Sequence, residues 1–174
     1  MKYLVKFIVV TFFLLICTHT FAEQKIVVLD LKFVLNNSKA GKDAQDFLQN
    51  SLNDSVKKYS DMEKELKKEE IDLLAKKTVL SREEYTKRSD SLRKKVIDYQ
   101  SQRRTSLEKI TTQRAEARQK LLEKLDPILK TYIKENDISL IIDKKNVLMG
   151  NTDLDITNII VKKLNKEFPY LSIK

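Results

Sequence analysis

Hydrophobic residues follow two different patterns along the chain. Short and nearly continuous apolar runs occur at 25–31, 138–142 and 147–149, and such runs are typical of strands that are covered on both faces. The last two runs flank the polar stretch 143–146, so they predict a β-hairpin. The middle of the chain instead repeats apolar residues every three or four positions, which is the period of a helix.

A last helix is predicted over 156–168. Asp155 precedes it as a candidate N-cap, and Pro169 follows its end. The apolar residues of this segment fall on one stripe, so the helix is expected to cover a core. They are Ile156, Ile159, Ile160, Leu164 and Phe168.

Two long helices are predicted over about 41–77 and 82–135. Ser81 and Glu84 fit a capping box that starts the second helix, and so short a connection makes the pair an antiparallel hairpin. Pro127 is expected to bend or step the second helix. At ~1.5 Å per residue, the hairpin would project on the order of 55 Å.

The seam between these helices is predicted as a thin, coiled-coil-like stripe. Its polar positions near the tip, such as Glu69 and Ser89, predict a looser hairpin there. The apolar seam residues are Ala44, Leu48, Leu52, Val56, Tyr59, Met62, Leu66 and Leu73 in the first helix, and Tyr85, Leu92, Val96, Tyr99, Leu107, Ile110, Ala117, Leu121 and Leu125 in the second.

The predicted fold is α+β and mostly α. Residues 23–40 and 136–174 form a small β-rich body, and 41–135 form the hairpin arm, with its tip near 78–81. A body of this size is marginal as an independent core, so we expect it to associate with copies of itself. The candidate oligomerisation residues are Ile26, Val27, Val28, Leu29, Leu140, Ile141, Ile142, Val147 and Leu148.

Composition favours long solvated helices over a compact enzyme. Of the 174 residues 34% are charged, and the chain has two Gly, two Pro, one Cys and one His. Such a chain has almost no side chains for a metal site or for a Cys- or His-based nucleophile. It also lacks a Gly-rich phosphate loop. We therefore expect no catalysis, no metal and no cofactor.

Residues 1–22 have the layout of a cleaved secretory signal peptide. Lys2 and Lys6 precede an apolar segment, and the segment ends at Ala22, where cleavage is expected. The remaining 152 residues would carry a net charge of +7 and no Cys or His. Export from the cytoplasm is therefore predicted.

Basic residues are in excess along the middle of the chain. Between Lys57 and Arg118 there are 18 Lys and Arg against 12 Asp and Glu. Helix-surface pairs such as Glu84–Arg88 and Asp90–Lys94 account for part of the charge, but not for its sign. An excess of this kind attracts unfolded acidic chains or an anionic membrane surface. The candidate contacts are Lys76, Lys77, Arg82, Lys87, Arg88, Arg93, Lys94 and Lys95.

Functions other than the binding of unfolded chains or an anionic surface remain open at this point. An adaptor coiled coil that bridges envelope components is the main alternative to such binding. Nucleic acid would suit the charge, but export removes the protein from most of it, so no nucleic-acid partner is expected. Tyr59, Tyr85, Tyr99 and Met62 could contact a client chain, although a place in the seam is the simpler interpretation.

The chain resembles the Skp/OmpH family of periplasmic chaperones. The segments that carry the resemblance are KIVVLDLKFVLNNSKAGKDAQ, ISLIIDKKNVLMGN and DLDITNIIVKKLN, which flank the charged hairpin. The resemblance implies a homotrimer with a shared β-rich body and helical arms around a cavity. It implies that unfolded outer-membrane β-barrel proteins are held there without ATP. Some members are proposed to bind lipopolysaccharide through basic arm residues, and of the candidate contacts named above Lys76, Lys77, Arg82, Lys87 and Arg88 lie near the tip.

Overall fold

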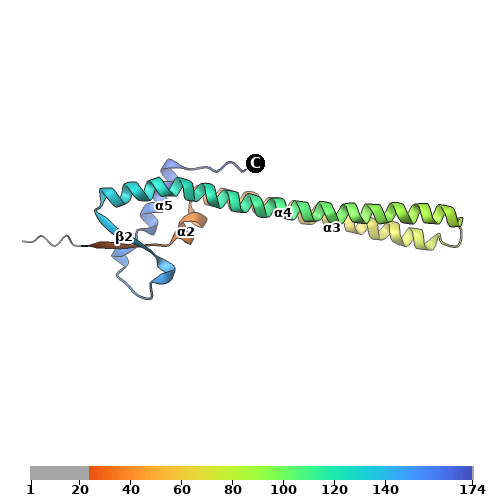
Figure 1. Ribbon diagram of the computed structural model, residues 1–174, viewed down its shortest axis with the longest axis horizontal. Coiled ribbons are helices and arrows are strands. Elements are labelled where there is room, and N and C mark those ends of the chain that lie inside the picture. The colour runs from red at the N-terminus through yellow and green to blue at the C-terminus, as the bar shows by residue number, and fades with distance from the viewer. Residues whose placement is uncertain (1–23, 174) are drawn as a thin grey trace, which may run out of the picture.

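A computed structural model describes residues 24–173, and the predicted signal peptide lies outside them. A small body of two strands and two short helices carries one long helical hairpin (Figure 1). No helix within 24–173 is both long and apolar enough to cross a membrane. The elements are β1 (Lys25–Leu29), α2 (Leu31–Asn37), α3 (Lys39–Ala75), α4 (Arg82–Glu135), β2 (Ile138–Asp143), the 3-10 turns η1 (Lys144–Asn146) and η2 (Thr152–Leu154), and α5 (Thr157–Glu167).

The two strands pair in parallel. Ile26 lies opposite Leu140 and Val28 opposite Ile142. Parallel strands need a long crossover connection, and here α2, α3 and α4 together provide it. The whole arm is therefore an insertion between two neighbouring strands, and its base is fixed by the sheet.

The body has one hydrophobic core beneath this sheet. It joins both strands, α2, α5 and the last turns of α4, so the arm base and the body share the same packed interior. Fully buried Leu125, Ile160 and Leu164 are among its largest side chains, and burying such a side chain contributes about 1.5–3 kcal/mol. The segment around Pro127 is part of this core, and α4 passes through Pro127 as one helix.

The predicted hairpin over 138–149 is wrong. β2 pairs with β1 instead, and Val147–Met149 lies outside any strand. The chain turns because the Asp143 carboxylate accepts from Lys145 N at 3.2 Å and the Lys144 carbonyl accepts from Val147 N at 3.1 Å. Leu148 and Met149 are then left almost fully exposed.

The first strand is shorter than predicted, because a helix begins at Leu31. Asp30 caps this helix by accepting from Phe33 N at 2.7 Å. Ser38 then ends α2 and caps α3, since its hydroxyl accepts from Gly41 N at 3.1 Å. The two helices thus meet at one buried serine.

The predicted hairpin arm is confirmed as a fold. Helices α3 and α4 pack along their length (Figure 1), and their bounds differ from the predicted ones by two residues at most. The Ser81 hydroxyl accepts from Glu84 N at 3.2 Å, as the capping box predicts. The Glu84 carboxylate does not reach back and instead pairs with Arg88 at 2.9 Å.

The middle of the seam differs from the prediction. Val56 and Leu107 are exposed, and the residues before them face each other, with the hydroxyls of Ser55 and Ser106 2.6 Å apart. A strict heptad continues from Tyr99 to Ser106, whereas the apolar pattern favoured Leu107. The position in the heptad repeat, and not hydrophobicity, therefore decides which residue faces the other helix here.

Aromatic packing lies next to this polar step. Tyr59 and Tyr99 are buried and pack edge to face, with ring centroids 6.1 Å apart. The Tyr59 hydroxyl donates to the Gln102 carbonyl at 3.0 Å. These two tyrosines are seam residues, as the simpler interpretation held.

The last helix runs over Thr157–Glu167, one residue shorter than predicted at each end. The Asp155 carboxylate accepts from Thr157 N at 2.9 Å, although Ile156 occupies the formal cap position. Ile159 is exposed and not part of the core stripe, while Ile160 and Leu164 are fully buried.

Candidate functional site

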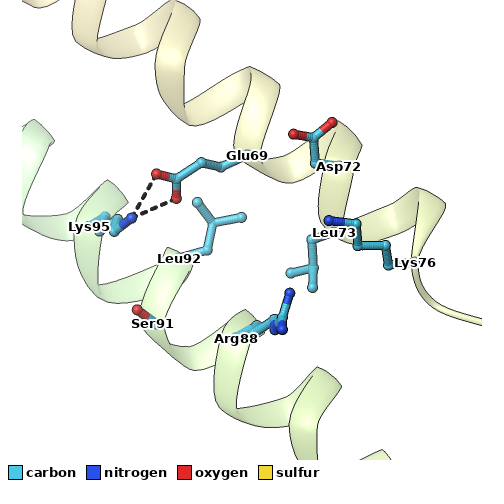
Figure 2. Close-up of a pocket in the computed structure, with 8 residues that line it drawn as sticks. All are labelled: Glu69, Asp72, Leu73, Lys76, Arg88, Ser91, Leu92 and Lys95. Atoms are coloured by element: carbon cyan, nitrogen blue, oxygen red, sulfur yellow. Dashed lines mark hydrogen bonds and ion pairs between the residues drawn. The ribbon is translucent and has the colours of Figure 1, made fainter. Parts of the chain in front are cut away.

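The arm near its tip carries a pocket between the two helices. It has a volume of about 250 Å³ and opens on one side of the hairpin. Figure 2 shows Leu73 and Leu92 at its floor, with charged side chains around them. The lining residues are Glu69, Asp72, Leu73 and Lys76 from the first half of the hairpin, and Arg88, Ser91, Leu92 and Lys95 from α4.

Charges in this pocket are largely balanced. Lys95 Nζ donates to both carboxylate oxygens of Glu69, at 2.7 and 2.8 Å, and so links the two helices (Figure 2). Arg88 is held by Glu84 at 2.9 Å. Both pairs are about half exposed, and ion pairs of this kind contribute at most about 1 kcal/mol. An anionic ligand could therefore replace Glu84 and Glu69 as the partners of these two basic side chains at low cost.

The structure brings three of the eight predicted basic contacts into this pocket. Lys76, Arg88 and Lys95 line it, while the other five do not. Arg93 pairs with Asp90 at 3.5 Å, in place of the expected Asp90–Lys94 pair. The predicted basic set is therefore not gathered in this one pocket.

A second and larger hollow lies at the base of the arm. This groove has a volume of about 1000 Å³ and is bordered by α2, the first turns of α3, α4 and the η1 turn. Its apolar lining includes Leu31, Leu35, Leu48 and Leu121. Arg114 and Arg118 of α4 stand on its rim, and neither has an ion-pair partner within 24–173.

The sheet has one face turned away from the core. Ile26 and Leu140 are paired in register and exposed, whereas Val27 and Leu29 on the other face are buried inside the single chain. Of the other residues predicted for oligomerisation, Val28, Ile141, Ile142 and Val147 are half-buried, and Leu148 is fully exposed. Apolar surface near the strands is thus available in a single chain.

Within the body, the pKa values of Asp155 and of its partner Lys144 are shifted. Partial burial opposes its ionisation, but hydrogen bonds from Lys144 Nζ at 2.7 Å and from Thr157 N outweigh this and lower the pKa of Asp155. The same contact raises the pKa of Lys144. The pair ties the η1 turn to the start of α5, next to β1, where Asp155 also bridges to Val28.

A metal site in a protein needs several His, Cys, Asp or Glu side chains close together. No cluster of His, Cys, Asp and Glu in 24–173 could hold a metal ion. The carboxylate neighbours Glu69 and Glu70 are exposed on the arm. What the arrangement offers is a long two-helix surface with a thin seam, exposed charge and two hollows.

The fold defines a class of proteins in which a helical hairpin arm is inserted into a small α/β body. Residues 25–164 match the family described as outer membrane protein (OmpH-like), and the chain belongs to this family. A Skp-like protein of Pseudomonas aeruginosa is 23% identical over 166 residues, which cover 95% of this chain and 99% of that protein.

A solved structure has the same fold. It is the crystal structure of a candidate outer membrane chaperone (OmpH-like) from Caulobacter crescentus, with a TM-score of 0.81. The match covers 90% of this chain and 93% of that one at 18% identity. The family named from the sequence and the predicted α+β, mostly helical fold with its long hairpin are both confirmed.

Sequence reasoning missed the groove at the arm base. Its lining comes from α2, which was not predicted, and from short segments of α3, α4 and η1 that are far from one another in the sequence. The capping pattern at Asp30 was the available signal for α2. The tip pocket was found only in part, because Glu69 was assigned to a polar seam position and Asp72 was not singled out.

Proposed function

We propose that this protein is an ATP-independent holdase chaperone. It binds unfolded outer-membrane β-barrel proteins between basic helical arms and keeps them from aggregating. The observation that carries the proposal is the arm, a long hairpin with a thin seam that belongs to a chain of the OmpH-like family. Many weak contacts on such a surface can retain a client without folding it, and no step needs a nucleotide.

Assembly as a homotrimer follows from the same proposal. The exposed sheet face at Ile26 and Leu140, together with Leu148 and Met149, supplies apolar surface that a second copy can cover. The division into a body (23–40 and 136–174) and an arm (41–135) is part of this proposal. Light scattering should give the mass of three chains, and a stable single chain would contradict this part.

The site of action is the periplasm. Support comes from the layout of residues 1–22, which is that of a signal peptide cleaved after Ala22. The basic residues near the tip suit lipopolysaccharide or another anionic membrane surface as a second partner. Lys76 in the tip pocket and the neighbouring Lys77, both exposed, are the first candidates for such contacts.

An aggregation assay tests the proposal. An outer-membrane β-barrel protein is diluted from urea without ATP, and its aggregation is followed by light scattering with and without this protein. We expect suppression at moderate salt that weakens as ionic strength rises, because exposed charges are screened. Unchanged aggregation at every salt concentration would refute the holdase.

A further inference from the structure

The two flanks of the arm are chemically different. In a helix, residues directly after the seam positions lie on one flank, and those directly before them lie on the other. The tip pocket shows the second flank, where Asp72 and Arg88 come together, each directly before a seam residue. The base groove shows the first flank, where Gln49 and Arg114 come together, each directly after a seam residue.

Four exposed apolar residues share the first flank. Each directly follows a seam residue, namely Ser55, Leu73, Val96 or Ser106. Because the hydroxyls of Ser55 and Ser106 are in contact, the residues after them are level with each other on the two helices. We name this set the apolar flank, and it consists of Val56, Leu74, Ile97 and Leu107.

The apolar flank continues the base groove. Gln49 of the groove precedes Val56 by one heptad on α3, and Arg114 follows Leu107 by one heptad on α4. Arg114 and Arg118, which have no ion-pair partner within 24–173, therefore lie beside a path of apolar residues from the groove toward the tip. The opposite flank carries the Glu69–Lys95 ion pair and the charged pocket, and its exposed large apolar residue is Phe47, near the base.

The spacing of these residues decides between two kinds of polypeptide partner. A helical partner needs an apolar contact every three or four residues, but Val56 and Leu74 are 18 positions apart. That separation corresponds to ~27 Å along a helix. An extended chain covers this distance with about eight residues, so an unfolded polypeptide can reach successive apolar contacts.

We infer that the apolar flank, together with the base groove, is the surface on which an unfolded client lies. This inference rests on the proposed holdase function and names its contact face. The client chemistry that fits is a flexible chain with scattered apolar side chains and acidic groups, the latter meeting Arg114 and Arg118. The ion-paired flank faces away from the client.

Photo-crosslinking tests the assignment with a matched pair of sites. Ile97 lies on the apolar flank and is 57% exposed, and Ile71 lies on the outer face of α3 and is 65% exposed. In the full chain, Ile97→p-benzoylphenylalanine and Ile71→p-benzoylphenylalanine are each mixed with an outer-membrane β-barrel protein diluted from urea. We expect a several-fold higher yield of crosslinked client at position 97. Aggregation is followed in the same samples.

Each outcome bears on a different statement. Suppressed aggregation with equal yields, or with a higher yield at position 71, would overturn the flank and leave the holdase standing. Aggregation that neither variant nor the unmodified chain suppresses would overturn both. A crosslink from position 97 to a second copy of the chain, unchanged when client is added, would show that the flank is a subunit interface and overturn the inference.

Discussion

Gly41→Ala should destabilise the protein although it replaces glycine within a helix. In an ordinary helix interior this change stabilises by about 0.5–1 kcal/mol. A Cβ at Gly41, however, would lie 1.9 Å from the Leu35 carbonyl oxygen and 2.9 Å from Ser38 Oγ, where real Cβ contacts are essentially never under 3.0 Å. The backbone at the α2–α3 junction would have to move by about 1 Å.

The cost of this movement falls on the core of the body. Ser38 is fully buried and caps α3 through its bond from Gly41 N, so a shift breaks the cap as well as the packing. Overpacking costs about 1–3 kcal/mol and a lost cap about 1 kcal/mol. We therefore expect a loss of about 3 kcal/mol in the free energy of unfolding, a large share of the 5–15 kcal/mol typical of a domain.

Urea unfolding followed by far-ultraviolet circular dichroism measures this loss. Gly150→Ala is the control, because a Cβ there meets only Val147 Cγ1 at an ordinary 3.7 Å, and we expect its effect to stay within about 0.5 kcal/mol. If Gly41→Ala were as stable as the unchanged chain, the close approach of Leu35 to α3 would be refuted.

Three further changes probe the body and the arm. The lowered pKa of Asp155 means that its contribution to stability is complete above the ordinary value of 3.8 and is lost as the pH falls through the folded pKa. When unfolding is measured at successively lower pH, the difference in stability between the unchanged chain and Asp155→Asn should therefore close below the folded pKa. A difference that stays constant would contradict this. Ser55→Ala and Ser106→Ala should each cost about 1 kcal/mol and the double variant less than their sum, which a double-mutant cycle measures; additivity would argue against the hydroxyl contact. Ser81→Ala should cost about 1 kcal/mol and speed amide hydrogen exchange at the start of α4, while Ser81→Asp, which keeps a capping oxygen, should do neither. Equal exchange in both variants would show that the side chain at position 81 does not stabilise the start of α4.

The arm could be predicted from the sequence because its signals are local. Ser81 marks the start of α4, and the three-and-four spacing identifies both helices without knowledge of their partners. The exception is the step at Ser55 and Ser106, where polar residues hold seam positions beside exposed Val56 and Leu107. Hydrophobicity alone chose the wrong neighbour because a thin seam can include polar contacts.

The body was harder to predict because its strands pair across the whole arm. Nothing local indicates that β2 pairs in parallel with β1, more than one hundred residues earlier. An apolar run such as Val147–Met149 is compatible with a strand, but whether it forms one depends on pairing with a strand edge, and within 24–173 it pairs with none. The candidate site depends on the same long-range packing, so the groove at the arm base emerged only with the fold.

The central claim is that this protein holds unfolded outer-membrane proteins, and one binding measurement tests it most directly. A fluorescently labelled β-barrel protein is titrated with this protein twice, once freshly diluted from urea and once already folded in detergent. The account predicts saturable binding of the unfolded form that weakens with salt, and no binding of the folded form. Equal binding of both forms, or binding of the folded form alone, would contradict the claim and favour an adaptor between envelope components.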